Sequence, residues 1–194
     1  DKWILSRINT VAREVTENLE RFEIGIALHK IYEFIWDEFC DWYIELVKPR
    51  LYDQEAPGRI EALYVLNEIL KNAMKLLHPF MPFITEEIYG HLITSDESIM
   101  ISEWPEYREG VLYPEEERVM KVIMDAIRGI RNRRLEMNVP ASRRAKAIFV
   151  TSDPDLASAV DREAPTFKRL ASISDAVVRK DKSGIADDAV AVVV

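Results

Sequence analysis

Apolar side chains in the first two thirds of the chain recur every three or four positions, the spacing of one face of a helix. In the first such segment they are Trp3, Ile4, Ile8, Val11, Val15, Leu19 and Phe22. The same spacing predicts helices over about 2–20, 24–51, 57–77, from Pro79 or Pro82 to Leu92, and 114–137. With only six glycines there are few tight turns. We therefore expect a mainly α fold, an antiparallel helical bundle.

Within the third helix the same pattern predicts an inward face of Ile60, Leu63, Leu66, Leu70, Met74 and Leu77. Residues 94–113 are polar and indicate an irregular connection with at most one short extended piece, "SIMISEWP". After Pro140 the pattern changes to short strands, "AKAIFV", "DAVVRK" and "AVAVVV", separated by two helical turns at about 153–171. We therefore predict two domains, a helical bundle over 1–143 and a small, truncated α/β annex over 144–194.

Composition excludes several classes of protein. An apolar content of 48% in 194 residues is enough for a packed core. A single cysteine excludes an internal disulfide and is typical of a reducing, cytoplasmic setting. No apolar run approaches the ~18 residues of a membrane span, so we expect no membrane partner. The formal charge of −8 argues against non-specific binding of nucleic acid.

Residues 37–51, "DEFCDWYIELVKPRL", contain the densest group of reactive side chains. Asp37, Asp41 and Glu45 share a helix face at four-residue spacing. No histidine of the chain follows a glutamate by three positions, as di-iron bundles require, so we predict no metal site. The pattern favours a packed helix instead. Its expected seam is Trp36, Phe39, Cys40, Tyr43 and Val47, and the aromatic residues Trp42, Phe80 and Phe83 are also expected in the core.

Two groups of cations suit a phosphate or a base. Lys48 and Arg50 close the long helix, where cations also complement the helix dipole. Between Arg128 and Lys146 seven cations accompany one carboxylate, Glu136. An acidic protein with one basic stripe can still hold RNA locally.

Three motifs in order, "DEFCDWYIELVKPRL", "LLHPFMPFITEEIY" and "IRNRRLEMNVPAS", resemble the anticodon-binding region of bacterial valyl-tRNA synthetases, which are class I enzymes. The resemblance covers residues 1 to about 145 well and the annex loosely. The run Trp42 to Pro49 is more similar to the valyl pattern than to the isoleucyl one. The resemblance implies a helical bundle that binds the anticodon arm of valine tRNA.

The resemblance also implies roles for individual residues. Lys48, Arg50 and Leu51 are the expected contacts to the anticodon loop, with Leu51 offering an apolar surface to a splayed base. Arg131, Arg133 and Arg134 are the expected contacts to backbone phosphates. Each group also has a purely structural alternative. The cations at the end of the long helix would only complement its dipole, and the three arginines would only form a solvated helix end.

The parent enzyme implied by the resemblance attaches valine to its tRNA with ATP and magnesium and edits misacylated threonine. The class I signatures "HIGH" and "KMSKS" do not occur in the 194 residues. We therefore expect no cofactor and no catalytic residue in this chain. Because residue 1 is Asp and the sequence begins in mid-pattern, we expect a fragment whose catalytic and editing domains lie upstream.

Two alternatives remain open on the sequence alone. One is the anticodon-binding domain of an isoleucyl-tRNA synthetase. The other is a helical protein-interaction module without an RNA role, which the acidic stretch at Glu115–Glu117 would favour.

Overall fold

The computed structural model describes residues 1–140, 142–186 and 189–194. Its packing divides the chain into two compact units, residues 1–117 and residues 118–194. The mainly α fold with a small α/β part is confirmed, because helices dominate and one two-stranded sheet lies near the C-terminus. The domain boundary placed at residues 143 and 144 marks the change from helices to strands and stays a prediction.

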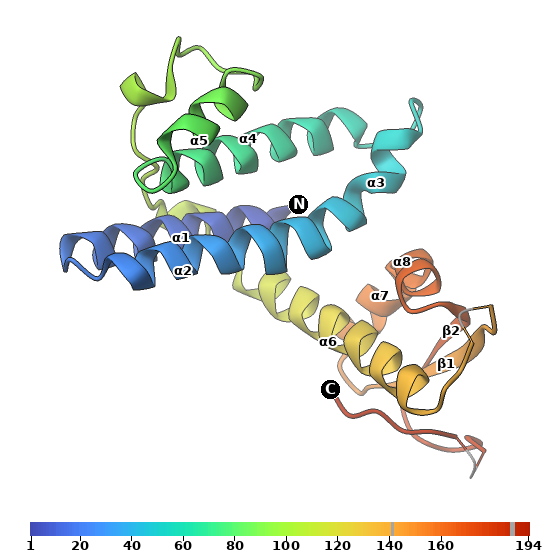
Figure 1. Cartoon of the computed structure of the whole chain (residues 1–194). Helices are drawn as coiled ribbons and strands as arrows, with labels where there is room; N and C mark the ends of the chain where they lie inside the picture. Colours follow the sequence, from blue (N-terminus) through green and yellow to red (C-terminus); the bar gives the residue numbers. More distant parts are fainter. Residues whose placement is uncertain (141, 187–188) are drawn as a thin grey trace. The chain divides into compact units, whose positions relative to one another are not determined.

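The first unit is a bundle in which α1 lies beside α2, and α4 packs against both α1 and α3 (Figure 1). Its elements are α1 (Lys2–Glu20), α2 (Ile24–Glu33), η1 (Phe34–Ile44), α3 (Glu45–Tyr52), α4 (Arg59–Leu77), α5 (Pro82–Tyr89), η2 (Ile99–Ile101) and η3 (Glu109–Val111). The first turn of α6 (Pro114–Glu136) completes it.

Helix α1 buries the face that its sequence predicts. Ile4 and Val15 are fully buried, and Trp3 meets the ring of Tyr43 edge-on at 6.3 Å between centroids. Phe22 departs from the prediction, because it is 86% exposed. It follows the end of α1 with a left-handed φ of 61°, and this reversal of the chain turns its side chain out of the apolar face.

Helix α4 packs on a different face from the predicted one. Ala62, Val65, Ile69 and Ala73 are buried, whereas Ile60 is 77% exposed. Leu63 is also exposed, while Leu66, Leu70 and Leu77 are half-buried and Met74 is buried as predicted. Small residues at 62 and 73 let a neighbouring helix approach closely, so the packed face follows the alanines rather than the largest side chains.

The predicted helix 24–51 is continuous in sequence but changes its winding. Residues 34–44 form the π-helix η1 between α2 and α3. Hydrogen bonds in a π-helix span five residues, so the buried residues Phe34 and Phe39 are five apart. The expected seam is therefore confirmed at Phe39, Tyr43 and Val47 and wrong at Trp36, which is 53% exposed.

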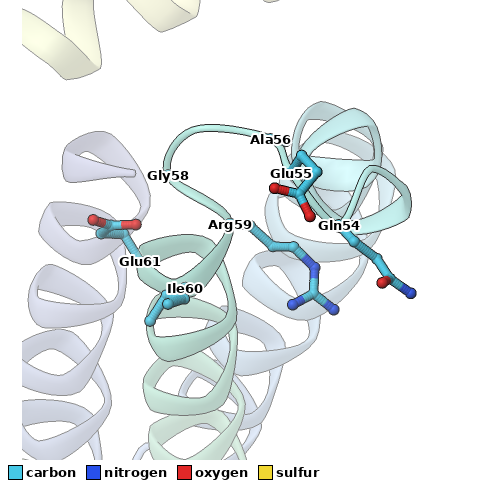
Figure 2. Close-up of a pocket in the computed structure, with 7 residues that line it drawn as sticks. All are labelled: Gln54, Glu55, Ala56, Gly58, Arg59, Ile60 and Glu61. Carbon is cyan, nitrogen blue, oxygen red and sulfur yellow. The ribbon is translucent and has the colours of Figure 1, made fainter.

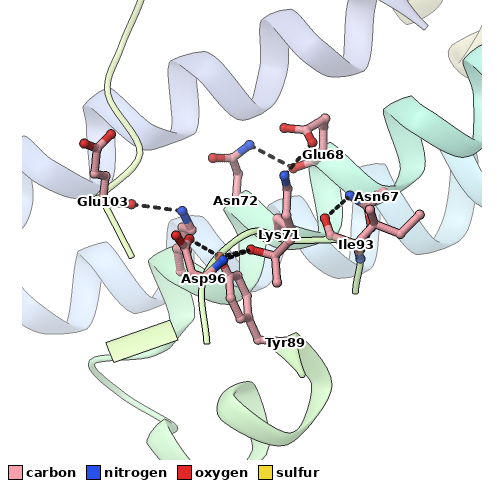
Figure 3. A network of polar contacts seen from close by, with 10 residues as sticks. Asn67, Glu68, Lys71, Asn72, Tyr89, Ile93, Asp96 and Glu103 are labelled. Atoms are coloured by element: carbon pink, nitrogen blue, oxygen red, sulfur yellow. Dashed lines mark hydrogen bonds and ion pairs between the residues drawn. The ribbon is translucent and has the colours of Figure 1, made fainter. Parts of the chain in front are cut away.

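Residues 94–113 form an irregular connection, as predicted, but it contains the short 3-10 turns η2 and η3 rather than an extended piece. Two asparagine side chains hold it to the bundle. Asn67 bonds both the N–H and the carbonyl of Ile93, at 2.9 and 3.0 Å (Figure 3). Asn9 of α1 bonds the N–H and the carbonyl of Arg108 in the same way. The Tyr89 hydroxyl donates to Asp96 at 2.9 Å. This network fixes the connection beside α4 and α5.

The second unit contains the rest of α6, β1 (Ala145–Val150), α7 (Pro154–Arg162), α8 (Ala164–Leu170) and β2 (Ile173–Arg179). The two strands pair in parallel, with Lys146 opposite Asp175 and Val150 opposite Arg179. A parallel pair needs a crossover, which α7 and α8 supply. Phe167 of α8 is fully buried and its ring centroid lies 4.7 Å from that of Phe149 in β1.

The predicted third strand "AVAVVV" is wrong, because the described residues 189–194 form no strand. Val192 instead lies against α6 at Gly129, where an added Cβ would sit 2.5 Å from a methyl of Val192. None of the helices in the described part of the chain combines the length and the apolar character that a membrane span requires.

Candidate functional site

The cations predicted at the end of the long helix lie at the corner between α3 and α4. Helix α3 ends at Tyr52, a turn follows over residues 53–58, and α4 begins at Arg59. Asp53 shapes the turn by accepting a bond from the N–H of Glu55 at 3.0 Å. The Arg59 guanidinium donates to the carbonyl of Leu51 at 3.4 Å, which links the two helices across the turn.

Arg50 is held by the carboxylate of Asp1, the residue directly before α1. It donates two bonds to Asp1, at 2.8 and 2.5 Å, and the Tyr43 hydroxyl donates to the same carboxylate at 2.7 Å. Burial raises the pKa of Tyr43 to about 12, although the positive charge of Arg50 opposes the shift. Two donors therefore share one acceptor, and the charge of Arg50 is largely compensated within the chain.

Lys48 also has a carboxylate partner, because its ammonium pairs with Glu45 one helical turn earlier. Leu51 is half-buried. The three residues predicted to contact RNA at this corner thus lie together at the end of α3. Their two cations are paired, so the corner presents less free positive charge than the sequence indicates.

A pocket of about 250 Å³ opens at this corner. Gly58, with a φ of 76°, adopts a conformation that glycine tolerates best, and Arg50 lies 3.5 Å from the place where a Cβ would stand. Figure 2 shows Gln54, Glu55 and Arg59 on one side of the turn, with Ile60 and Glu61 on the other. The lining residues are Gln54, Glu55, Ala56, Gly58, Arg59, Ile60 and Glu61.

Four residues that shape this corner are not among those predicted from the sequence. Tyr52 and Ile60 are 80% and 77% exposed, which leaves an aromatic ring and an aliphatic side chain facing solvent. Gln54 and Arg59 add an amide and a guanidinium at the pocket. The signal available in the sequence was an aromatic residue immediately after Leu51, at the point where the helical pattern breaks.

Carboxylates outnumber cations at the corner, so it suits unpaired bases better than backbone phosphates. Exposed rings and amides suit the faces and edges of unpaired bases. Paired cations beside carboxylates suit backbone phosphates poorly, because a like charge repels them. The cations are Lys48, Arg50 and Arg59, and the carboxylates are Asp1, Glu45, Asp53, Glu55 and Glu61.

The arginines predicted to contact phosphates lie in the last two turns of α6, and each has a partner within the chain. Arg131 donates to the carbonyl of Leu170 at 2.7 Å, and Arg133 pairs with Glu136 at 2.8 Å. Arg134 donates to the carbonyls of Pro140 and Arg143, at 3.2 and 2.7 Å. Arg131 and Arg134 therefore hold the backbone that follows α6, and their contact with phosphates stays a prediction.

The thiol and the possible metal ligands of the described residues show neither an activated nucleophile nor a metal site. Burial raises the pKa of the Cys40 thiol, which disfavours the nucleophilic thiolate. No group of three or more His, Cys, Asp or Glu side chains in the described ranges is placed to hold a metal ion. Trp36 and Phe83, expected in the core, are 53% and 91% exposed, because η1 and α5 turn them outward.

Comparisons with known proteins identify the family. A family model described as the anticodon-binding domain of tRNA ligase matches residues 1–149. The valine--tRNA ligase of Clostridium perfringens is 47% identical over 194 residues, which are 100% of this chain and 22% of that protein. That of Carboxydothermus hydrogenoformans is 46% identical over 180 residues, which are 93% of this chain and 20% of that protein. The chain thus spans about a fifth of the length of these curated relatives.

Proposed function

The chain belongs to the anticodon-binding domain family of tRNA ligases, and we propose that it binds the anticodon arm of valine tRNA within a valine--tRNA ligase. One observation carries the proposal. The similarity to valine--tRNA ligases extends over the whole chain, at 44–47% identity for three clostridial relatives. No observation favours the isoleucyl alternative or the protein-interaction module.

The corner between α3 and α4 supports this proposal chemically. A splayed base needs a surface on which to stack and groups that bond its edge. Tyr52 and Leu51 supply the surface, and Gln54 and Arg59 supply donors at the pocket. Lys48 and Arg50 stand beside it and define its charge. In this role the domain positions the tRNA and performs no chemical step.

The chemical steps then belong to other parts of a longer protein. We propose that catalytic and editing domains outside these 194 residues activate valine with ATP and magnesium, transfer it to tRNA and remove misacylated threonine. We also propose a cytoplasmic location, where tRNA is charged.

Fluorescence anisotropy of the 194-residue chain tests the proposal. The RNAs are a valine anticodon stem-loop, an isoleucine anticodon stem-loop and a valine loop with its central base changed, each at low and moderate salt. We expect tighter binding of the valine loop than of the other two. Equal binding of all three would contradict base recognition by this chain, and no binding at low salt would contradict an RNA role of the isolated chain.

A further inference from the structure

The two units differ sharply in charge. Residues 1–117 contain 11 lysines and arginines against 24 carboxylates, a formal charge of −13. Residues 118–194 contain 15 against 10, a formal charge of +5. Backbone phosphates supply most of the salt-dependent affinity for RNA, and they are attracted to clustered lysine and arginine. The second unit is therefore where phosphate contacts are electrostatically favoured.

Helix α6 is followed by a turn over residues 137–140. Asn138 adopts a left-handed φ of 51°, and the N–H of Val139 bonds the carbonyl of Arg134 at 2.9 Å. The Arg134 side chain then reaches forward to the carbonyls of Pro140 and Arg143. Its Nη1 atom is buried and has no hydrogen-bond acceptor among the described residues. One terminal nitrogen of the guanidinium is thus buried, while the other bonds the two carbonyls.

Three cations directly follow this turn. Arg143, Arg144 and Lys146 are exposed, and none of the ion pairs found among the described residues involves their side chains. Asp175, which lies opposite Lys146 in the sheet, pairs with Lys168 at 3.5 Å. Arg143 and Arg144 lie directly before β1, and Lys146 is its second residue, so the three cations gather where the chain enters the strand. They differ from Arg131 and Arg134, whose guanidinium groups bond backbone carbonyls.

We propose that Arg143, Arg144 and Lys146 contact backbone phosphates of the bound RNA, and that Arg134 is a positioning residue that orients them. This assignment rests on the proposed function and gives that function its phosphate-binding surface. Under this proposal the acidic first unit contacts the bases, and the second unit contacts the phosphate backbone of the RNA.

The test compares the 194-residue chain with the triple variant R143Q/R144Q/K146Q, using the valine stem-loop at several salt concentrations. Each phosphate contact contributes roughly 0.7 to 0.9 to the slope of log K against log salt, so we expect the slope to fall by about 2 to 3. We expect affinity at low salt to fall about tenfold or more, equally for the valine loop and the central-base mutant, because phosphate contacts carry no base information.

The matched control is R162Q/K180Q/K182Q, which removes the same charge from exposed positions of the same unit. We expect it to change the slope by less than about 1. Equal effects of the two triple variants would overturn the proposal, because net charge alone would then explain binding. A second outcome is that the unaltered chain prefers the valine loop while R143Q/R144Q/K146Q shows the same affinity and the same salt slope as the unaltered chain. In that case the inference fails and the proposed function stands. No RNA binding by the unaltered chain at low salt would overturn both.

A second variant isolates the positioning role. R134K keeps the charge but cannot reach two carbonyls with a rigid fork of donors. We expect a slope reduced by roughly 1 to 2 with the circular dichroism spectrum of the unaltered chain. An unchanged slope in R134K would overturn the role of Arg134.

Discussion

The first and second units differ in the surfaces that they present, which are aromatic in the first and cationic in the second. Of the 18 aromatic residues, 16 lie in residues 1–117, and several of them are exposed, including Tyr32, Tyr52 and Phe83. The second unit has only Phe149 and Phe167, and neither is exposed. Its surface is cationic instead. Recognition of a single strand combines stacking with charge, and here the two properties lie in different units of one chain.

The difference shows why total charge is a poor guide to function in this chain. The value of −8 hides a strongly acidic part and a basic part. In the proposed role, the acidic surface of the first unit repels the phosphates of an RNA that makes no base contacts, which would add selectivity. In the same proposed role, the basic unit would attract RNA phosphates whatever the base sequence. Single-residue variants in each unit probe this difference.

The largest effect should come from the core of the second unit. Phe167→Ala removes a fully buried ring that packs on Phe149, and such truncations cost about 3–5 kcal/mol of unfolding free energy. We expect amide hydrogen exchange to show lost protection in β1 and β2 but retained protection in α1 and α4. Ile69→Ala, a fully buried residue of α4, is the converse control. Loss of protection across both units in either variant would show that they unfold together.

The next effect concerns the base surface. Tyr52→Ala removes an exposed ring at the corner pocket, and stacking of a base on an aromatic ring contributes about 1–3 kcal/mol. We expect weaker binding of the valine stem-loop with an unchanged salt slope, because no charge is removed. The matched control is Phe83→Ala, since Phe83 is 91% exposed on α5 of the same unit. Equal losses in both variants would remove the corner as the site of base contact.

The helices were predictable from the sequence, but the corner was only half predictable. Helical spacing located α1 and α4 because their apolar positions repeat. It misplaced the packed face of α4 because Ile60 and Leu63 are larger than Ala62 and Ala73, and periodicity alone cannot tell a close contact from an exposed stripe. It also missed the outward turn of Trp36, because the chain adopts π rather than α winding there.

The candidate cations show a second limit. Lys48, Arg50, Arg131 and Arg134 were chosen for their charge, and the sequence places them correctly at two helix ends. The partners of Arg50 and Arg131 are distant in sequence. Asp1 is 49 residues from Arg50, and the carbonyl of Leu170 is 39 residues from Arg131. Backbone carbonyls leave no trace in residue identity, so only the fold distinguishes a cation that holds the chain from one that faces solvent.

The third prediction separates the two cations of the corner. Arg50→Ala breaks two charge-assisted hydrogen bonds in a half-buried site, and we expect it to lower the free energy of unfolding by about 1–2 kcal/mol. Lys48→Ala breaks a single ion pair, with Glu45, which is more exposed and contributes about 0.5 kcal/mol or less. Denaturant unfolding measures both. A loss for Lys48→Ala as large as that for Arg50→Ala would contradict the structural role of the contact with Asp1.

The smallest effect is a pH dependence confined to the first unit. Because burial raises the pKa of Tyr43 to about 12, the folded state favours the neutral phenol more than the unfolded state does. The stability that this contributes is fully present below the unfolded pKa of about 10 and is lost as pH rises through 12. An ultraviolet absorbance titration of tyrosinate should show one late transition that Tyr43→Phe removes and Arg50→Ala moves to still higher pH, since Arg50 lowers this pKa. The variant R143Q/R144Q/K146Q should leave the transition in place, and any displacement there would show that the charges of the second unit act on the first.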